Sequence, residues 1–114
     1  MKTLLILNDP PYGTERSYNG LRLAKALGTE GASVTVFLLA DAVACANRGQ
    51  KVPQGFYNLE LMLNSVARNG EVLLCGTCMD ARGINDEAII EGARRSTMKE
   101  LAERTLAADQ VLVF

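Results

Sequence analysis

Two cysteines three positions apart, Cys75 and Cys78, are the side chains of this 114-residue chain best suited to covalent chemistry. They follow the apolar run Val72–Leu74, which is typical of a buried strand. The run stops at Cys75, and the small, polar and glycine-bearing residues after it predict a loop. Ligands of α/β sheets bind beyond the carboxyl ends of the strands, so this placement indicates a thiol at a binding edge.

The sequence leaves two interpretations of Cys75 open. A buried cysteine at a strand end is often a small hydrophobic residue. Alternatively, Cys75 is a thiolate nucleophile that loop amides and a nearby cation such as Arg82 stabilise. The nearby Cys78 favours the chemical interpretation, because two close thiols are rarely needed for packing. The third cysteine, Cys45, lies in a short segment expected to be helical and is interpreted as a core residue.

The composition excludes several kinds of chemistry. The chain has no histidine, which removes Ser-His and Cys-His catalytic pairs, imidazole acid–base chemistry and histidine metal ligation. One Cys-x-x-Cys plus Cys45 supplies only three thiolates, so we expect no metal, although Asp41 or Asp80 could complete an atypical zinc set. An odd number of cysteines implies no stable disulfide framework.

Charge and hydropathy limit the expected partners and compartment. The 12 basic and 13 acidic residues nearly balance, which argues against a nucleic-acid or anionic-membrane surface. No apolar run approaches the roughly 20 residues of a membrane-spanning helix. The first apolar run ends at Asn8–Pro11 and is too short for a signal-peptide core, so a cytoplasmic protein is expected.

The chain alternates apolar runs with segments of helical spacing, which predicts an α/β fold with a mostly parallel sheet covered on both sides, in a single domain of residues 1–114. Strands are expected at Thr3–Leu7, Val34–Leu39, Val72–Leu74 and Gln110–Phe114. Helices are expected from Ser17 to about Leu27 with Gly28 at the C′ position, from Asp41 to Asn47, from Asn58 to Asn69, from Asn85 to Ala93, and from Thr97 through Leu101 and Leu106. Ser17, Asp41, Asn58 and Thr97 are the predicted N-caps, the last as a capping box with Glu100. The Arg94–Arg95 pair is interpreted as solvated helix surface.

Parallel strands place the segments that follow them at one edge of the sheet, so three segments should meet there. These are the Asn8–Thr14 loop, Asp41 and the Cys75–Arg82 segment. The loop lacks a P-loop ending and the glycine triplet of a dinucleotide fingerprint, so it is either a proline-stiffened turn or a wall of a thiol pocket. The candidate pocket residues beside Cys75 and Cys78 are Asn8, Asp9, Tyr12, Gly13, Thr14, Asp41, Gly76, Thr77, Asp80 and Arg82.

The Asn8–Thr14 loop and the segment Leu-Cys-Gly-Thr-Cys-Met-Asp-Ala-Arg-Gly-Ile at positions 74–84 together resemble the DsrE/DsrF-like family of sulfur metabolism. The similarity extends from Leu4 to Phe114. It implies a three-layer α/β/α sandwich that forms homo- or hetero-oligomers, often trimers or hexamers. In sulfur-relay members a single cysteine carries a persulfide, and its spacing to an Arg-Gly pair matches that of Cys75 to Arg82–Gly83. The resemblance therefore implies a sulfur carrier or sulfurtransferase with its persulfide on Cys75, a protein donor and acceptor, and no metal or organic cofactor.

Two other functions stay open at this point. The first is a dithiol oxidoreductase or redox sensor that uses the Cys75–Cys78 pair directly. Thioredoxin-like motifs open a long helix near the chain start, whereas this motif follows a late strand and Gly83 soon interrupts any helix. The second is a non-catalytic oligomeric binding module. Phe56, Tyr57 and the Leu59–Met62 helix start supply apolar surface for a homo-oligomer.

The role of Cys78 can be predicted if the protein carries sulfur. Loading needs one thiolate, so Cys78 should be dispensable for it. Release should be faster with Cys78, because a neighbouring thiol reaches the persulfide at high effective concentration and leaves an intramolecular disulfide.

Overall fold

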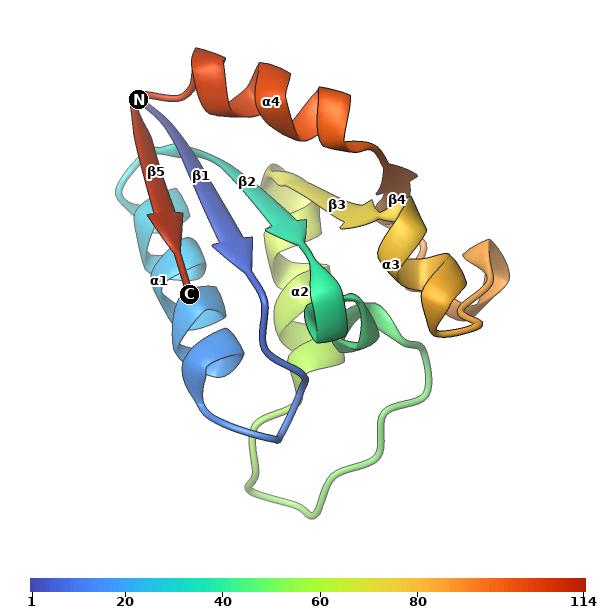
Figure 1. The fold of residues 1–114 in the computed structure, drawn as a ribbon. Coiled ribbons are helices and arrows are strands. Elements are labelled where there is room, and N and C mark those ends of the chain that lie inside the picture. Colours follow the sequence, from blue (N-terminus) through green and yellow to red (C-terminus); the bar gives the residue numbers. More distant parts are fainter.

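A five-stranded sheet of parallel strands in the order β4-β3-β2-β1-β5 forms the middle of the protein (Figure 1). The computed structural model describes residues 1–114. The strands are β1 (Lys2–Leu7), β2 (Ser33–Leu38), β3 (Glu71–Cys75), β4 (Ala93–Ser96) and β5 (Gln110–Val113). Four of them coincide with predicted strands, and their shared direction places all carboxyl ends at one edge.

Helices cover both faces of this sheet. α1 (Arg16–Thr29) and α2 (Leu59–Asn69) connect β1 to β2 and β2 to β3, and they pack against each other on one face (Figure 1). α4 (Met98–Ala107) returns the chain from β4 to the opposite edge, and right-handed crossovers therefore place it on the other face. The predicted three-layer α/β/α sandwich is confirmed. Three short elements, η1 (Ala40–Ala46), α3 (Gly76–Ala81) and η2 (Asp86–Ala88), complete the chain.

The core explains the apolar composition of the central strands. Leu5, Val36 and Leu73 are fully buried. Because helices cover both faces, these strands are nearly continuous apolar runs rather than alternating ones. Leu101 on α4 is buried, but Leu106, the other apolar residue named for this predicted helix, is 89% exposed. Five helical positions correspond to a rotation of about 140°, so the two side chains lie on different sides of α4. None of the helices is long and apolar enough to cross a membrane.

Two of the predicted N-caps are confirmed. Asn58 Oδ1 accepts the Leu61 N–H at 3.1 Å, and Thr97 Oγ1 accepts the Glu100 N–H at 3.1 Å. The prediction of Ser17 as an N-cap is wrong, because α1 begins at Arg16 and Ser17 lies buried inside the helix.

The predicted end of α1 at Gly28 is also wrong. α1 continues through Gly28 to Thr29, and Glu30 forms its C-cap. Gly31 has a φ of +96° and makes the left-handed turn that Gly28 was expected to make. A glycine suits that position because it has no Cβ to clash in the left-handed region.

The predicted helix from Asn85 to Ala93 is wrong. The chain forms only the short η2 there and then β4, whose Ala93–Ser96 segment pairs with Val72–Cys75 of β3. The interpretation of Arg94 and Arg95 as solvated helix surface is wrong for the same reason. Both arginines project from an edge strand and pair with acidic side chains on either side of the sheet.

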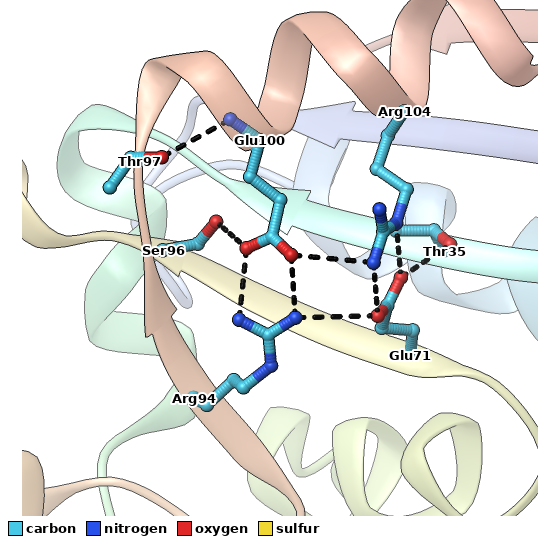
Figure 2. A network of polar contacts seen from close by, with 7 residues as sticks. All are labelled: Thr35, Glu71, Arg94, Ser96, Thr97, Glu100 and Arg104. Atoms are coloured by element: carbon cyan, nitrogen blue, oxygen red, sulfur yellow. Dashed lines mark hydrogen bonds and ion pairs between the residues drawn. The ribbon is translucent and has the colours of Figure 1, made fainter.

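A network of ion pairs fixes α4 to the sheet (Figure 2). Arg94 binds Glu100 through two N–H···O bonds of 2.9 and 2.6 Å, and Arg104 binds Glu71 through two bonds of 2.8 Å. Arg104 also reaches Glu100 at 3.3 Å, and Ser96 donates to the same carboxylate. The Glu100 carboxylate is therefore held by these side chains and does not close the second half of a capping box.

Candidate functional site

Cys75 is the last residue of β3, as the sequence predicts, and it lies at the carboxyl edge of the sheet. The prediction of a loop after Cys75 is wrong, because Gly76–Ala81 forms the short helix α3. Cys75 is the N-cap of this helix, and its Sγ accepts the Cys78 N–H at 3.4 Å. Gly83, at a φ of +64°, makes the turn that ends α3. A cysteine thus occupies a position where serine, threonine or aspartate usually signals a helix start.

The environment of Cys75 raises the pKa of its thiol. The main cause is burial, and the neighbouring Cys78 thiol also contributes, while the N–H groups of Cys78 and Thr77 act in the opposite direction. Cys75 is only 7% exposed. Reaction at Cys75 therefore requires the thiol to lose its proton during the encounter, because a buried thiolate is not favoured.

Cys78 has a different environment one turn along α3. It is partly exposed, and its Sγ accepts the N–H of Ala40 at 3.2 Å. Ala40 is the first residue of η1 and has a φ of +51°, an unusual value for a residue with a Cβ. The sequence gives no signal for this contact, because Ala40 is 38 positions away and has no functional side chain.

Arg82 connects the two segments that carry this contact. Its Nε donates to Asp41 Oδ1 at 2.9 Å, and its Nη1 donates to the carbonyl oxygen of Cys78 at 3.1 Å. The predicted cap role of Asp41 is wrong, because Leu39 is the N-cap of η1 and no side chain caps it. Arg82 thus joins η1 to α3, and its partner is Asp41 rather than the sulfur of Cys75.

Arg95 is a residue of the site that the sequence analysis missed. Its Nη1 donates to the carbonyl oxygen of Gly76 at 3.0 Å and to Asp80 at 2.9 Å, and its Nε donates to Asp86 at 2.9 Å. A Cβ on Gly76 would lie 2.9 Å from the Cγ of Arg95, so only glycine fits here without displacing the arginine. Arg95 therefore holds α3 directly behind Cys75. β4 has only four residues, so the alternation of its side chains between the two faces is too short a pattern to predict the role of Arg95.

The loop after β1 is fixed by contacts with the first helix and the last strand. The N–H and Nδ2 of Asn8 both donate to the Phe114 carbonyl oxygen at 3.1 Å. The Asp9 carboxylate accepts the Thr14 hydroxyl at 2.6 Å, and the Asp9 carbonyl oxygen accepts the Ser17 hydroxyl at 2.7 Å. These bonds explain why Ser17 points into the protein rather than capping α1.

Tyr12 connects the same loop to the start of α2. Its hydroxyl accepts the Leu59 N–H at 3.0 Å and donates to Gln50 Oε1 at 2.5 Å. The three tyrosines of the chain form one stack, in which the ring of Tyr57 lies 5.7 Å from that of Tyr12 and 4.1 Å from that of Tyr18. The stack ties the Asn8–Thr14 loop, which carries Tyr12, and the loop before α2, which carries Tyr57, to Tyr18 of α1.

The three predicted segments emerge at the same edge of the sheet. Asp41 and Arg82 meet beside Cys78, and β2 lies between the strand before the Asn8–Thr14 loop and the strand that carries Cys75. Gly13, Thr77 and Asp80 lie at this edge and are exposed. Cys45 is fully buried, and its pKa is raised to about 12 mainly by burial, which confirms it as a core residue.

The parallel sheet with helices on both faces, and the Cys-Gly-Thr-Cys segment at the carboxyl end of β3, define the class of this protein: a small α/β protein with a cysteine pair at a strand end. The sequence model of the DsrE/DsrF-like family matches residues 1–114, and the chain belongs to this family.

Individual relatives are similar over their whole length. Protein YchN of Escherichia coli K12 is 44% identical, with 99% of this chain and 98% of YchN covered. The crystal structure of YchN superposes with a TM-score of 0.94 over 100% of this chain and 99% of that one. Sulfurtransferase TusD of Cronobacter sakazakii is 29% identical, with 100% of both chains covered.

Proposed function

We propose that this protein is a sulfur carrier that holds a sulfane sulfur as a persulfide on Cys75. The observation that carries the proposal is the position of the Cys75 sulfur, which lies at the carboxyl end of β3 and accepts a backbone N–H. Family membership and the similarity to a protein named sulfurtransferase TusD support the same class of reaction. Because the chemistry is an exchange between sulfur atoms, it needs no metal or organic cofactor.

The loading step is a thiol exchange. The Cys75 sulfur attacks the outer sulfur of a persulfide, a new S–S bond forms, and the inner sulfur of that persulfide leaves as a thiolate. An acceptor thiolate takes the sulfur by the reverse exchange. Alternatively, Cys78 attacks the Cys75 sulfur, sulfide leaves, and a Cys75–Cys78 disulfide remains for an external dithiol to reduce.

A retention experiment tests this function. The protein is incubated with a low-molecular-weight persulfide, rinsed briefly with a small thiol, and weighed by intact mass spectrometry. Wild type should retain one or more added sulfur atoms, and Cys75→Ser should retain none, while Cys45→Ala should behave like wild type. Serine at position 75 can still cap α3, so loss of sulfur would not reflect loss of the helix. A wild-type protein that retains no sulfur would contradict the proposal.

A dithiol redox protein or sensor is the second candidate. The observation in its favour is the contact between the two cysteines, in which the Cys78 N–H donates to the Cys75 sulfur at 3.4 Å. Catalysed reduction of insulin disulfides that needs both Cys75 and Cys78 would favour it over a sulfur carrier. Thiols that are inert in both assays would favour a non-catalytic oligomeric binding module.

We also propose that the protein works as a homo-oligomer, trimer or hexamer, in the cytoplasm, with protein donors and acceptors and without nucleic acid or membrane. Of the apolar surface expected near the start of α2, Leu59 is fully buried, whereas Phe56 and Leu61 are about two-thirds exposed. Val113 of β5 and Leu106 of α4 add exposed apolar side chains. Large exposed apolar groups favour association, and closed symmetry would use the same patch on each copy.

Light scattering at micromolar concentration should therefore give a multiple of the 12.3 kDa chain mass. The mass of a single chain under these conditions would contradict the proposed assembly.

A further inference from the structure

The two thiols of the site differ in their access to solvent. Cys75 is buried at the end of β3, whereas Cys78 is partly exposed on α3. The backbone N–H of Cys78 donates to the Cys75 sulfur, so the two residues are in direct contact. Cys78 is therefore the more accessible of the two cysteines for a donor persulfide that approaches from solvent.

The sulfur of Cys78 also has a hydrogen-bond donor that the sequence does not reveal. The Ala40 N–H lies 3.2 Å from Cys78 Sγ, and Ala40 adopts a φ of +51°. A left-handed conformation costs roughly 1–2 kcal/mol for a residue with a Cβ, so surrounding contacts must hold it. A donated N–H stabilises a sulfur atom most when that atom carries negative charge.

The pair formed by Arg82 and Asp41 supplies such contacts. Asp41 follows Ala40 directly, and Arg82 binds both the Asp41 carboxylate and the Cys78 carbonyl oxygen. The bond to Asp41 holds the start of η1, and the bond to Cys78 holds α3. Together they fix the position of the Ala40 N–H relative to the Cys78 sulfur.

Resting on the proposed function, we propose that Cys78 receives the sulfur from the donor and passes it inward to Cys75, with Arg82 as a positioning residue. In the first step the Cys78 thiolate attacks the outer sulfur of R–S–SH, which gives Cys78–S–SH and releases R–S⁻. In the second step Cys75 attacks that same outer sulfur. A Cys75–S bond forms, the Cys78–S bond breaks, and the Cys75 proton passes to the departing Cys78 sulfur. No electrons are gained or lost in either step.

This order of events gives the burial of Cys75 a function. A persulfide on the buried sulfur is shielded from solution thiols, whereas one on Cys78 remains open to exchange. The proposal replaces the expectation that Cys78 is dispensable for loading, because that expectation assumed that a donor could reach Cys75 directly.

Several charged groups surround α3. Cys75 and Arg82 lie on the same segment, and Asp41 faces it from η1. Arg95 binds Asp80, Asp86 and the carbonyl oxygen of Gly76 at the start of α3. Of the charged side chains in this set, Arg82 is the one that bonds to Cys78 itself.

A loading time course tests the order of transfer. Wild type, Cys75→Ser and Cys78→Ser are mixed with cysteine persulfide, quenched by alkylation at set times, and the sulfur is located by fragmenting the 69–82 peptide. Cys75→Ser should gain sulfur on Cys78 at the wild-type initial rate. Cys78→Ser should load Cys75 roughly tenfold more slowly or worse, because it loses the intramolecular step. Cys78→Ala is measured as a second variant. Its far-ultraviolet circular dichroism spectrum should match that of wild type, so that slow loading cannot be attributed to a folding defect.

The outcomes separate this inference from the proposed function. Loading of Cys75 at the wild-type rate in Cys78→Ser and Cys78→Ala would overturn inward transfer and leave the carrier function standing. A wild-type protein that retains no sulfur on either cysteine would overturn the carrier function itself.

The positioning role of Arg82 has its own readout. Arg82→Gln and Asp41→Asn should each slow the first step several-fold, because the Ala40 N–H is no longer held in place, and Arg82→Lys, which keeps a cation for Asp41, should recover part of the rate. Arg68→Gln removes an exposed arginine from the end of α2 and serves as the charge-matched control, with the wild-type rate. A wild-type rate of the first step in both site variants would overturn the role assigned to Arg82.

Discussion

Replacing Gly70 with alanine is expected to lower the free energy of unfolding by about 2–3 kcal/mol. Gly70 is the C-cap of α2, immediately before β3. A Cβ at this position would lie 2.5 Å from the Val34 carbonyl oxygen and 3.2 Å from that of Val66. Both are backbone atoms of a strand and a helix, so neither can rotate away as a flexible side chain would. Urea unfolding followed by circular dichroism measures the loss.

Gly28→Ala is the matched control for this prediction. Gly28 lies inside α1, is exposed, and has no atom within 4 Å of the position where a Cβ would be. Alanine at an open helical position should stabilise the protein by roughly 0.5–1 kcal/mol. Equal unfolding midpoints for the two alanine variants would show that the close approach at Gly70 does not limit the fold.

Replacing Glu100 with glutamine should lower stability at neutral pH and remove part of the acid sensitivity of the fold. The bonds from Arg94 and Ser96 lower the pKa of Glu100 from 4.5 to about 2 (Figure 2). A carboxylate with a lowered pKa stabilises the fold fully above its unfolded value, and this contribution is lost as the pH falls from about 4.5 through about 2. Solvent screens the network, so we expect a loss of about 1–2 kcal/mol at neutral pH.

The measurement is the unfolding free energy of wild type and variant between neutral pH and pH 2. The difference between them should be constant down to about pH 4.5 and should narrow as the pH approaches 2, because wild-type Glu100 then also becomes neutral. Glu91→Gln replaces an exposed glutamate outside the network and should follow the wild-type curve. A constant difference across the whole range would disprove the linkage to Glu100.

Most of the sheet could be predicted because β1, β2 and β3 are buried on both faces and appear in the sequence as apolar runs with clear boundaries. β5 is largely exposed, but its residues after Gln110 also form an apolar run. β4 could not be predicted in this way, because it has only four residues and two of them are arginines. Its arginines are compatible with a sheet edge only because Glu100, Asp80 and Asp86 are brought to them by the fold.

The site could be predicted in position but not in arrangement. The end of an apolar run located Cys75 at the carboxyl edge of the sheet, and the spacing placed Cys78 beside it. Which thiol is buried depends on α3, a six-residue helix that begins with glycine and has no strong helical signal. The contact of Cys78 with Ala40 depends on a pairing between distant segments, which local patterns do not encode.

The exposed apolar side chains of α4 and β5 link the stability of the fold to the protein concentration. Leu106 and Val113 can be buried only against another molecule, because they are exposed within the chain. If copies of the chain bury them together, folding and association become one equilibrium, and the midpoint of unfolding rises with protein concentration. Free energies of variants at Gly70 and Glu100 are then comparable only at equal subunit concentration.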